Sequence, residues 1–122
     1  MHSMTENYLI AALWSSTDNT NEQGGDPLDA NYSLDDIAPE SVEQAEKDCL
    51  AFIAENDGDI DGDYEQAGYD FWLTRNHHGA GFWDGDWDEE RNGMIGQRLT
   101  EASHKFGEVN AVVGDDGKIY LE

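Results

Sequence analysis

The chain has 122 residues, of which 28 are Asp or Glu and only six are Lys or Arg, so its formal net charge is −22. Solubility alone is usually met by a net charge of magnitude about 2–8 in a small domain. A surface this negative repels nucleic acid and anionic membranes, so we expect basic proteins as partners, and neither nucleic acid nor membrane. Hydrophobic residues make up 38% of the sequence, which is enough for one folded domain over residues 1–122.

The cysteine content and the hydropathy point to a cytoplasmic protein. Cys49 is the single cysteine, so no disulfide forms within the chain, which fits a reducing compartment. There is no apolar run of about 18 residues, as a membrane-spanning helix would need. The first residues lack the basic and then apolar pattern of a signal peptide.

The first half of the chain predicts two helices separated by a long acidic loop. A capping-box pattern at residues 3–6 and a repeat of apolar residues predict a helix over 5–15. Residues 16–38 read as an acidic loop whose second half is held to the core by Leu28, Tyr32, Leu34 and Ile37. Pro39 suits the first turn of a second helix over 39–56, whose buried stripe includes Cys49 and Phe52.

The second half predicts two hairpins around a third helix. Residues 69–75 alternate as a strand, and 76–79 read as a turn into a second strand over 80–83. Residues 92–106 have helical spacing and end at Gly107. Residues 109–113 and 118–121 predict a final hairpin. The expected fold is therefore α+β, with about three helices and a small antiparallel sheet of about four strands, in the order α-α-β-β-α-β-β.

Residues 57–63 (DGDIDGD) suggest a calcium-binding loop. They place acids at loop positions 1, 3, 5 and 7 and glycine at position 6, as in an EF-hand. Position 12, however, is Gly68, where a bidentate glutamate is required, so a complete EF-hand is rejected. Weak divalent binding and a solvated acidic loop are the remaining interpretations.

A second acidic cluster follows at residues 84–90. Crowded carboxylates resist ionising together, so some of them should have a raised pKa. We therefore expect mild acidification toward pH ~5, or added salt, to raise the melting temperature.

The sequence offers little for catalysis. Histidine can bind a metal or act as a general base, so His77 and His78 are candidates for either role. Adjacent histidines in a predicted turn, however, point in different directions. Cys49 falls on the apolar stripe of the second helix, which favours a core position. Arg75, Arg91 and Arg98 are expected to tether nearby carboxylates. We predict no catalytic residue, no metal and no cofactor.

The tryptophans leave two interpretations open. Trp72, Trp83 and Trp87 share one face of the predicted hairpin. They form either part of the core, if helices cover both faces, or an exposed aromatic patch that anchors a partner.

Residues 67–84 (AGYDFWLTRNHHGAGFWD) resemble a motif found in small acidic proteins of bacteriophages and mobile elements, and the likeness continues more weakly through residues 99–102 to 114–120. Members of that group have no assigned activity, so the resemblance implies a setting and no mechanism. Phages encode several unrelated acidic proteins that imitate DNA, and the resemblance would place this chain in a host bacterial cytoplasm.

The number of charges matches that of a DNA duplex about as long as the folded chain is wide. Duplex DNA carries one charge per about 1.7 Å, so 22 charges correspond to about 37 Å, close to the ~35 Å diameter of a compact chain of this length. Residues 1–65 hold 17 acids and one base, whereas residues 66–122 hold 11 acids and five bases. Adaptation to high salt would spread the charge more evenly.

The sequence therefore predicts a DNA-mimicking inhibitor, monomeric or a two-fold dimer, that fills the basic groove of a host DNA-binding enzyme. The alternative is a calcium-responsive or acidic interaction module that binds a basic protein, and a small hydrolase using His77 or His78 is a third class. The predicted contact residues are Asp35, Asp36, Glu40, Glu43, Asp57, Asp59, Asp61, Asp63, Glu65, Asp84, Asp86 and Asp88, with Trp72 and Trp83 as aromatic anchors.

Overall fold

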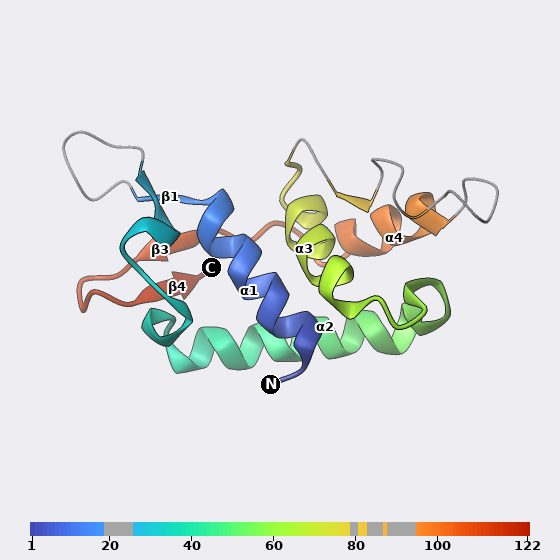
Figure 1. The fold of residues 1–122 in the computed structure, drawn as a ribbon, viewed down its shortest axis with the longest axis horizontal. Helices are drawn as coiled ribbons and strands as arrows, with labels where there is room; N and C mark the ends of the chain where they lie inside the picture. The colour runs from blue at the N-terminus through green and yellow to red at the C-terminus, as the bar shows by residue number, and fades with distance from the viewer. Residues whose placement is uncertain (19–25, 79–80, 83–86, 88–94) are drawn as a thin grey trace.

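The computed structural model describes residues 1–18, 26–78, 81–82, 87 and 95–122. Within them the fold is α+β, as predicted (Figure 1). Its helices are α1 (Ser3–Ser15), α2 (Pro39–Ile60), α3 (Tyr64–Arg75) and α4 (Ile95–His104), with 3₁₀ turns η1 (Leu28–Ala30) and η2 (Leu34–Asp36). Two antiparallel pairs complete it: β1 (Thr17–Asp18) with β2 (Asp26–Pro27), and β3 (Ala111–Val113) with β4 (Ile119–Leu121).

The core is built around α1 and α3, which pack closely along each other. Gly68 permits this approach, because a Cβ at that position would collide with the Met4 carbonyl oxygen and the Tyr8 backbone nitrogen. The Tyr8 ring lies 5.4 Å from Phe71 and 5.3 Å from Trp72, between ring centroids. Figure 1 shows α2 along one edge of the molecule, with the β3–β4 hairpin toward one end and α4 toward the other.

The predicted strand over 69–75 is wrong, because residues 64–75 form helix α3. Residues 76 and 77 of the predicted turn do lie in a turn, but it follows a helix, and residue 79 lies outside the described residues. All five positions from 71 to 75 are buried, including a threonine and an arginine. Because this second half of α3 is buried on every side, it shows no polar face, and its apolar residues fit a strand period as well as a helical one. Residues 80 and 83 of the predicted second strand lie outside the described residues.

The other predicted helices and the last hairpin are confirmed. Helix α1 begins at Ser3, and its cap is the His2 ring, whose Nδ1 accepts from the Met4 N–H at 3.0 Å, in place of the predicted capping box. Helix α2 continues past residue 56 to Ile60, with a kink at Asn56, where φ is −130°. Helix α4 lies inside 92–106, and β3 pairs with β4 in register.

The predicted loop at 16–38 contains short elements of its own. Leu28 and Ile37 are buried, and Tyr32 and Leu34 pack against the core, as predicted. The Ala38 N–H donates to the Ile119 carbonyl at 2.8 Å, which ties this segment to β4. None of the described helices is long and apolar enough to cross a membrane.

Candidate functional site

The described candidate acids gather at the two ends of α2. Those near its start come from η2 and from the first turns of the helix, and those near its end come from its last turn and the connection to α3. At 1.5 Å per residue, Glu40 and Asp57 are separated by about 26 Å along the axis. We call them the N-terminal acidic cluster (Asp35, Asp36, Glu40, Glu43) and the C-terminal acidic cluster (Asp57, Asp59, Asp61, Asp63, Glu65).

The N-terminal acidic cluster is mostly open to solvent. Asp36 is its most constrained member, because its Oδ2 accepts from the Ser33 N–H at 2.8 Å. Glu40 follows Pro39 in the first helical turn, where the helix dipole favours a negative charge. Glu43 lies 3.9 Å from the Lys47 ammonium, with both side chains about 70% exposed. An exposed pair of this kind adds little stability.

The C-terminal acidic cluster is more strongly bonded to the protein itself. The Tyr64 hydroxyl donates to Asp57 Oδ1 at 2.8 Å, and this bond raises the pKa of Tyr64. Arg98 reaches Asp59 with two bonds, of 2.8 Å from Nε and 2.6 Å from NH2, which raise the pKa of Arg98. Asp61 adopts a left-handed conformation with φ of 52°.

This geometry does not support an EF-hand. Asp57 and Asp59 lie within the last turn of α2 and are bonded to Tyr64 and Arg98. The described residues contain no group of three or more His, Cys, Asp or Glu side chains arranged to hold a metal ion.

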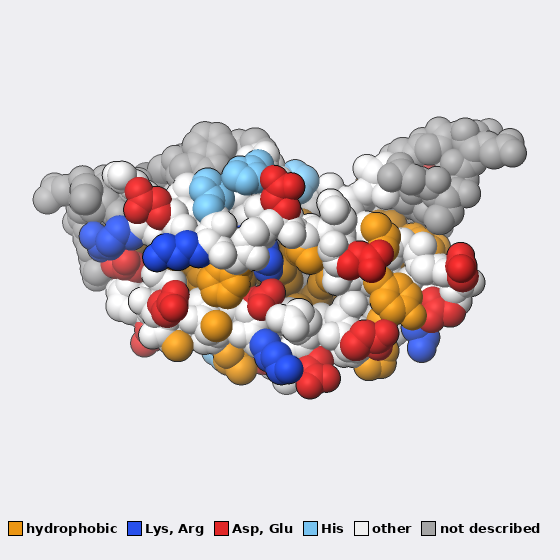
Figure 2. Space-filling model, turned by 180° about the vertical axis from the view of Figure 1, so that it is seen from behind, with side chains coloured by type: hydrophobic (Ala, Val, Ile, Leu, Met, Phe, Trp, Pro, Cys, Tyr) orange, Lys and Arg blue, Asp and Glu red, His pale blue; other side chains and the backbone are white. Residues whose placement is uncertain are grey.

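Between the two clusters α2 carries one exposed acid, Glu55, among basic, neutral and apolar side chains. Lys47, Leu50, Ala51 and Ala54 are exposed there, with Leu50 at 47%. In Figure 2, which shows the molecule from behind, acidic side chains are spaced among neutral and apolar ones, with Lys and Arg side chains between them. The acids therefore form separate patches and do not make a continuous row along α2.

One acid of α2 points inward, to a buried arginine. The Arg75 side chain is 5% exposed, and its NH1 lies 2.9 Å from Asp48 Oδ2 and 3.0 Å from the Tyr8 hydroxyl. Its Nε and NH2 donate to the carbonyls of Gly107 (2.8 Å) and Phe106 (2.9 Å). Arg75 thus joins α1, α2, α3 and the segment after α4.

The prediction that arginines tether local carboxylates is confirmed for Arg75 and Arg98. Arg91 lies outside the described residues. The core position of Cys49 is also confirmed, and burial raises the pKa of its thiol to about 12, which leaves it protonated and unsuited to act as a nucleophile.

Trp72 belongs to the core and does not form an exposed anchor. It is 1% exposed, and its Nε1–H donates to Ser15 Oγ at 2.8 Å. Trp87 is half-buried, with its Nε1–H donating to Asp70 Oδ2 at 2.6 Å. The predicted contact residues Trp83, Asp84, Asp86 and Asp88 lie outside the described residues, as does the rest of the 84–90 cluster except Trp87.

The two histidines after α3 have different surroundings. His77 adopts φ of 57°, its Nε2 lies 3.4 Å from Glu108 Oε1, and its ring centroid lies 4.6 Å from that of His104. Histidine side chains gather at the upper edge of the face in Figure 2. His78 instead lines a pocket.

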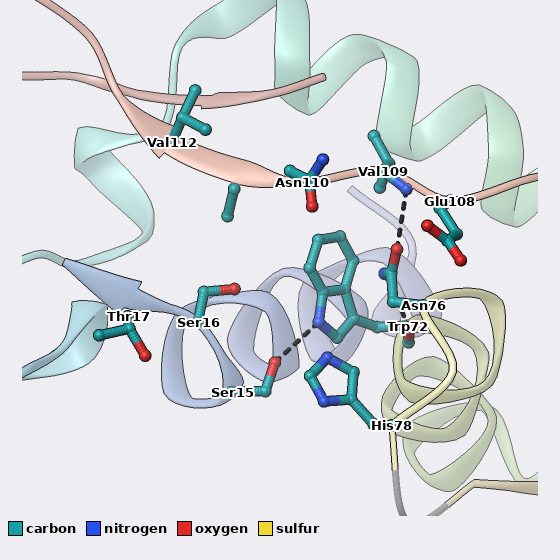
Figure 3. Close-up of a pocket in the computed structure, with 11 residues that line it drawn as sticks. Ser15, Ser16, Thr17, Trp72, Asn76, His78, Glu108, Val109, Asn110 and Val112 are labelled. Carbon is teal, nitrogen blue, oxygen red and sulfur yellow. Dashed lines mark hydrogen bonds between the residues drawn. The ribbon is translucent and has the colours of Figure 1, made fainter. Parts of the chain in front are cut away.

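That pocket, of about 410 Å³, lies between the ends of α1 and α3 and strand β3 (Figure 3). Its volume falls in the range of about 300–1,000 Å³ typical of ligand sites. The Ser15 hydroxyl already donates to the Ala11 carbonyl at 2.6 Å and accepts from Trp72, so it is not arranged as a nucleophile. The lining residues are Ser15, Ser16, Thr17, Trp72, Asn76, His78, Glu108, Val109, Asn110, Ala111 and Val112.

Sequence reasoning missed this pocket because it joins three segments that are far apart in the chain. The nearest signal is the polar run at residues 15–17, which follows the apolar run at residues 8–14.

No protein-family model, no curated protein and no solved structure matches this chain. Its function must therefore be inferred from charge, fold and contacts.

Proposed function

We propose that this protein is a DNA mimic that inhibits a host DNA-binding enzyme by occupying its DNA-binding groove. Suitable targets are DNA gyrase or another topoisomerase, a restriction or CRISPR nuclease, or a DNA repair enzyme. The observation that carries the proposal is the net charge of −22, with 28 acids against six bases.

The basic side chains are too few to neutralise the acids, so most of this negative charge stays uncompensated. Lys47, Arg75 and Arg98 each lie within 4 Å of an acid of the same chain. At most six of the 28 acids can be neutralised one to one, so the field outside the protein stays strongly negative.

The length of α2 supports the same proposal. Its 22 residues span about 33 Å, against about 34–36 Å for one turn of duplex DNA. Because the two acidic clusters lie at its two ends, the matching groove has two basic patches about 26 Å apart, each contacting one acidic cluster.

The mechanism is competitive exclusion. Lys and Arg side chains that normally neutralise phosphates would contact carboxylates in their place. Charge steers the encounter, so association should be fast and should slow steeply as salt is added.

The alternative is an acidic module that binds a basic protein without imitating a duplex. The interruption of the acidic face by Lys47 and Leu50 favours it, because a duplex presents an unbroken row of phosphates. A calcium titration followed by tryptophan fluorescence tests its calcium-responsive form. A saturable change at micromolar calcium favours the module.

Capture from a bacterial lysate, with and without excess duplex DNA, tests the proposal. Tagged protein should recover a DNA-binding enzyme that the duplex displaces. The variant Glu40→Lys with Glu43→Lys should lose that enzyme, while its charge-matched control, Asp115→Lys with Glu122→Lys, reverses two exposed acids outside both clusters and should keep it. Partners that resist the duplex would contradict mimicry.

A further inference from the structure

The pocket of Figure 3 exposes the open edge of strand β3. The Glu122 N–H donates to the Asn110 carbonyl, and the Gly114 N–H donates to the Lys118 carbonyl, both at 2.8 Å. In an antiparallel pair, hydrogen-bonded and non-bonded positions alternate. Ala111 is therefore a non-bonded position, whose N–H and C=O point away from β4 and toward the pocket.

The backbone N–H and C=O at the middle of this edge, those of Ala111, have no hydrogen-bond partner among the described residues. The Val109 N–H is taken by Asn76 Oδ1 at 2.8 Å. The other side of β4 is covered, because Ile119 forms a bridge with Ile37.

Beyond its shortness of three residues, β3 carries no charge and no proline along its edge. Edge strands are usually shielded by charges, proline or a bulge. Residues 109–113 read Val-Asn-Ala-Val-Val, with no charge and no proline in a chain where 28% of residues are charged. The opposite wall of the pocket includes Thr17 of β1, which belongs to a separate strand pair.

We propose that this pocket binds an extended, Lys- or Arg-containing segment of a partner protein, which adds as a strand to β3 through the backbone of Ala111. Strand addition gains its affinity from main-chain hydrogen bonds. We expect the partner segment to carry Lys or Arg because Glu108 at the pocket rim, with a 65% exposed side chain, and the net charge of −22 both attract cations. The inference rests on the β3 edge and does not require that the target bind DNA.

A labelled heptapeptide of alternating Lys and Val is the probe, with a peptide N-methylated at every residue as its control. Both peptides carry the same charge, but the methylated one has no backbone N–H. We expect at least about fivefold weaker binding of the control, since each lost hydrogen bond costs about 1 kcal/mol. Equal binding of the two would show attraction by charge alone and would overturn the proposal.

Two substitutions at one position test the protein side. Ala111→Pro removes the outward N–H without touching the β3–β4 bonds, so peptide affinity should fall about fivefold. Ala111→Gly keeps the N–H and should keep the affinity. Because the proline variant could disturb the hairpin, hydrogen exchange of the wild-type Ala111 amide is the second measurement. The peptide should slow it about tenfold. Unchanged exchange would contradict strand addition.

A second copy of the chain is the competing occupant, and sedimentation equilibrium distinguishes it. If the Ala111 amide is already protected without peptide and loses protection on dilution, the edge pairs with its own copy, and the proposal fails. Loss of duplex competition in the capture experiment would overturn the DNA mimic but would leave these results unaffected.

Discussion

Two Arg–Asp pairs show how differently this molecule uses charge inside and outside. Arg75 is buried and pairs with the half-buried Asp48, and it also binds Tyr8 and two backbone carbonyls. Arg98 makes two hydrogen bonds to the equally half-buried Asp59 at the end of α2, but Arg98 itself is half exposed. The inner pair connects four segments, whereas the outer pair connects two.

The difference indicates which acids are available to a partner. An acid that satisfies a buried cation cannot be withdrawn without loss of stability, whereas an exposed pair can exchange its cation for one on another protein. We therefore expect folding to depend on the inner pair, and binding to depend on the two acidic clusters.

The largest effect is expected for Arg75→Ala. It leaves Asp48, the Tyr8 hydroxyl and two carbonyls without their donor, and should lower the free energy of unfolding by about 3–5 kcal/mol. Arg98→Ala is the matched control and should change stability much less. Urea unfolding measures the free energy of unfolding of both variants. Equal decreases would contradict the different roles of the inner and the outer pair.

Gly68→Ala should cost about 1–3 kcal/mol, because the new methyl group forces α1 and α3 apart. Gly58→Ala, on the exposed end of α2, meets nothing within 4 Å and should be neutral or stabilising by up to about 1 kcal/mol. The melting temperatures of the two variants compare a substitution in the α1–α3 core with one on the exposed end of α2. A neutral Gly68→Ala would contradict the close packing of α1 on α3.

Added salt should stabilise the folded protein through its surface acids. Screening weakens the repulsion among the acids, so the melting temperature should rise by about 5 °C between low salt and 0.5 M NaCl, which corresponds to about 1 kcal/mol. Calorimetry at fixed pH measures this. A melting temperature independent of salt would mean that the acids are well separated or bridged.

The smallest effect is expected for Tyr120→Phe. The Tyr120 hydroxyl donates to Asp116 at 2.6 Å, which raises the pKa of Tyr120 to about 12 and lowers that of Asp116.

The folded state therefore keeps the tyrosine proton above pH ~10, where the unfolded chain loses it, and this contribution disappears as the pH rises through 12. The Asp116 contribution is present above its unfolded pKa of ~3.9 and disappears as the pH falls. The difference in urea midpoint between wild type and variant should be largest near neutral pH. A difference that grows at either extreme would refute this pairing.

The sequence predicted those parts of the fold that have one buried and one exposed face. Helices α1, α2 and α4 have apolar residues at helical spacing and recognisable end signals, such as Pro39 at the start of α2 and Gly107 three residues after the end of α4. Helix α3 was not predicted, because Phe71, Trp72 and Arg75 are all buried and leave no polar stripe.

The candidate site was predictable in composition but not in arrangement. The acids of both clusters could be named from the sequence, but the pairing of Asp59 with Arg98 joins residues 39 positions apart. The open edge of β3 likewise depends on how the hairpin is placed against α1.

Competition for the captured enzyme tests the proposed mimicry most directly. A labelled duplex bound to that enzyme is titrated with this protein while fluorescence anisotropy is followed. The proposed function predicts complete displacement of the duplex, with an apparent affinity that weakens in proportion to duplex concentration. A ternary complex, in which the duplex stays bound at saturating protein, would contradict it.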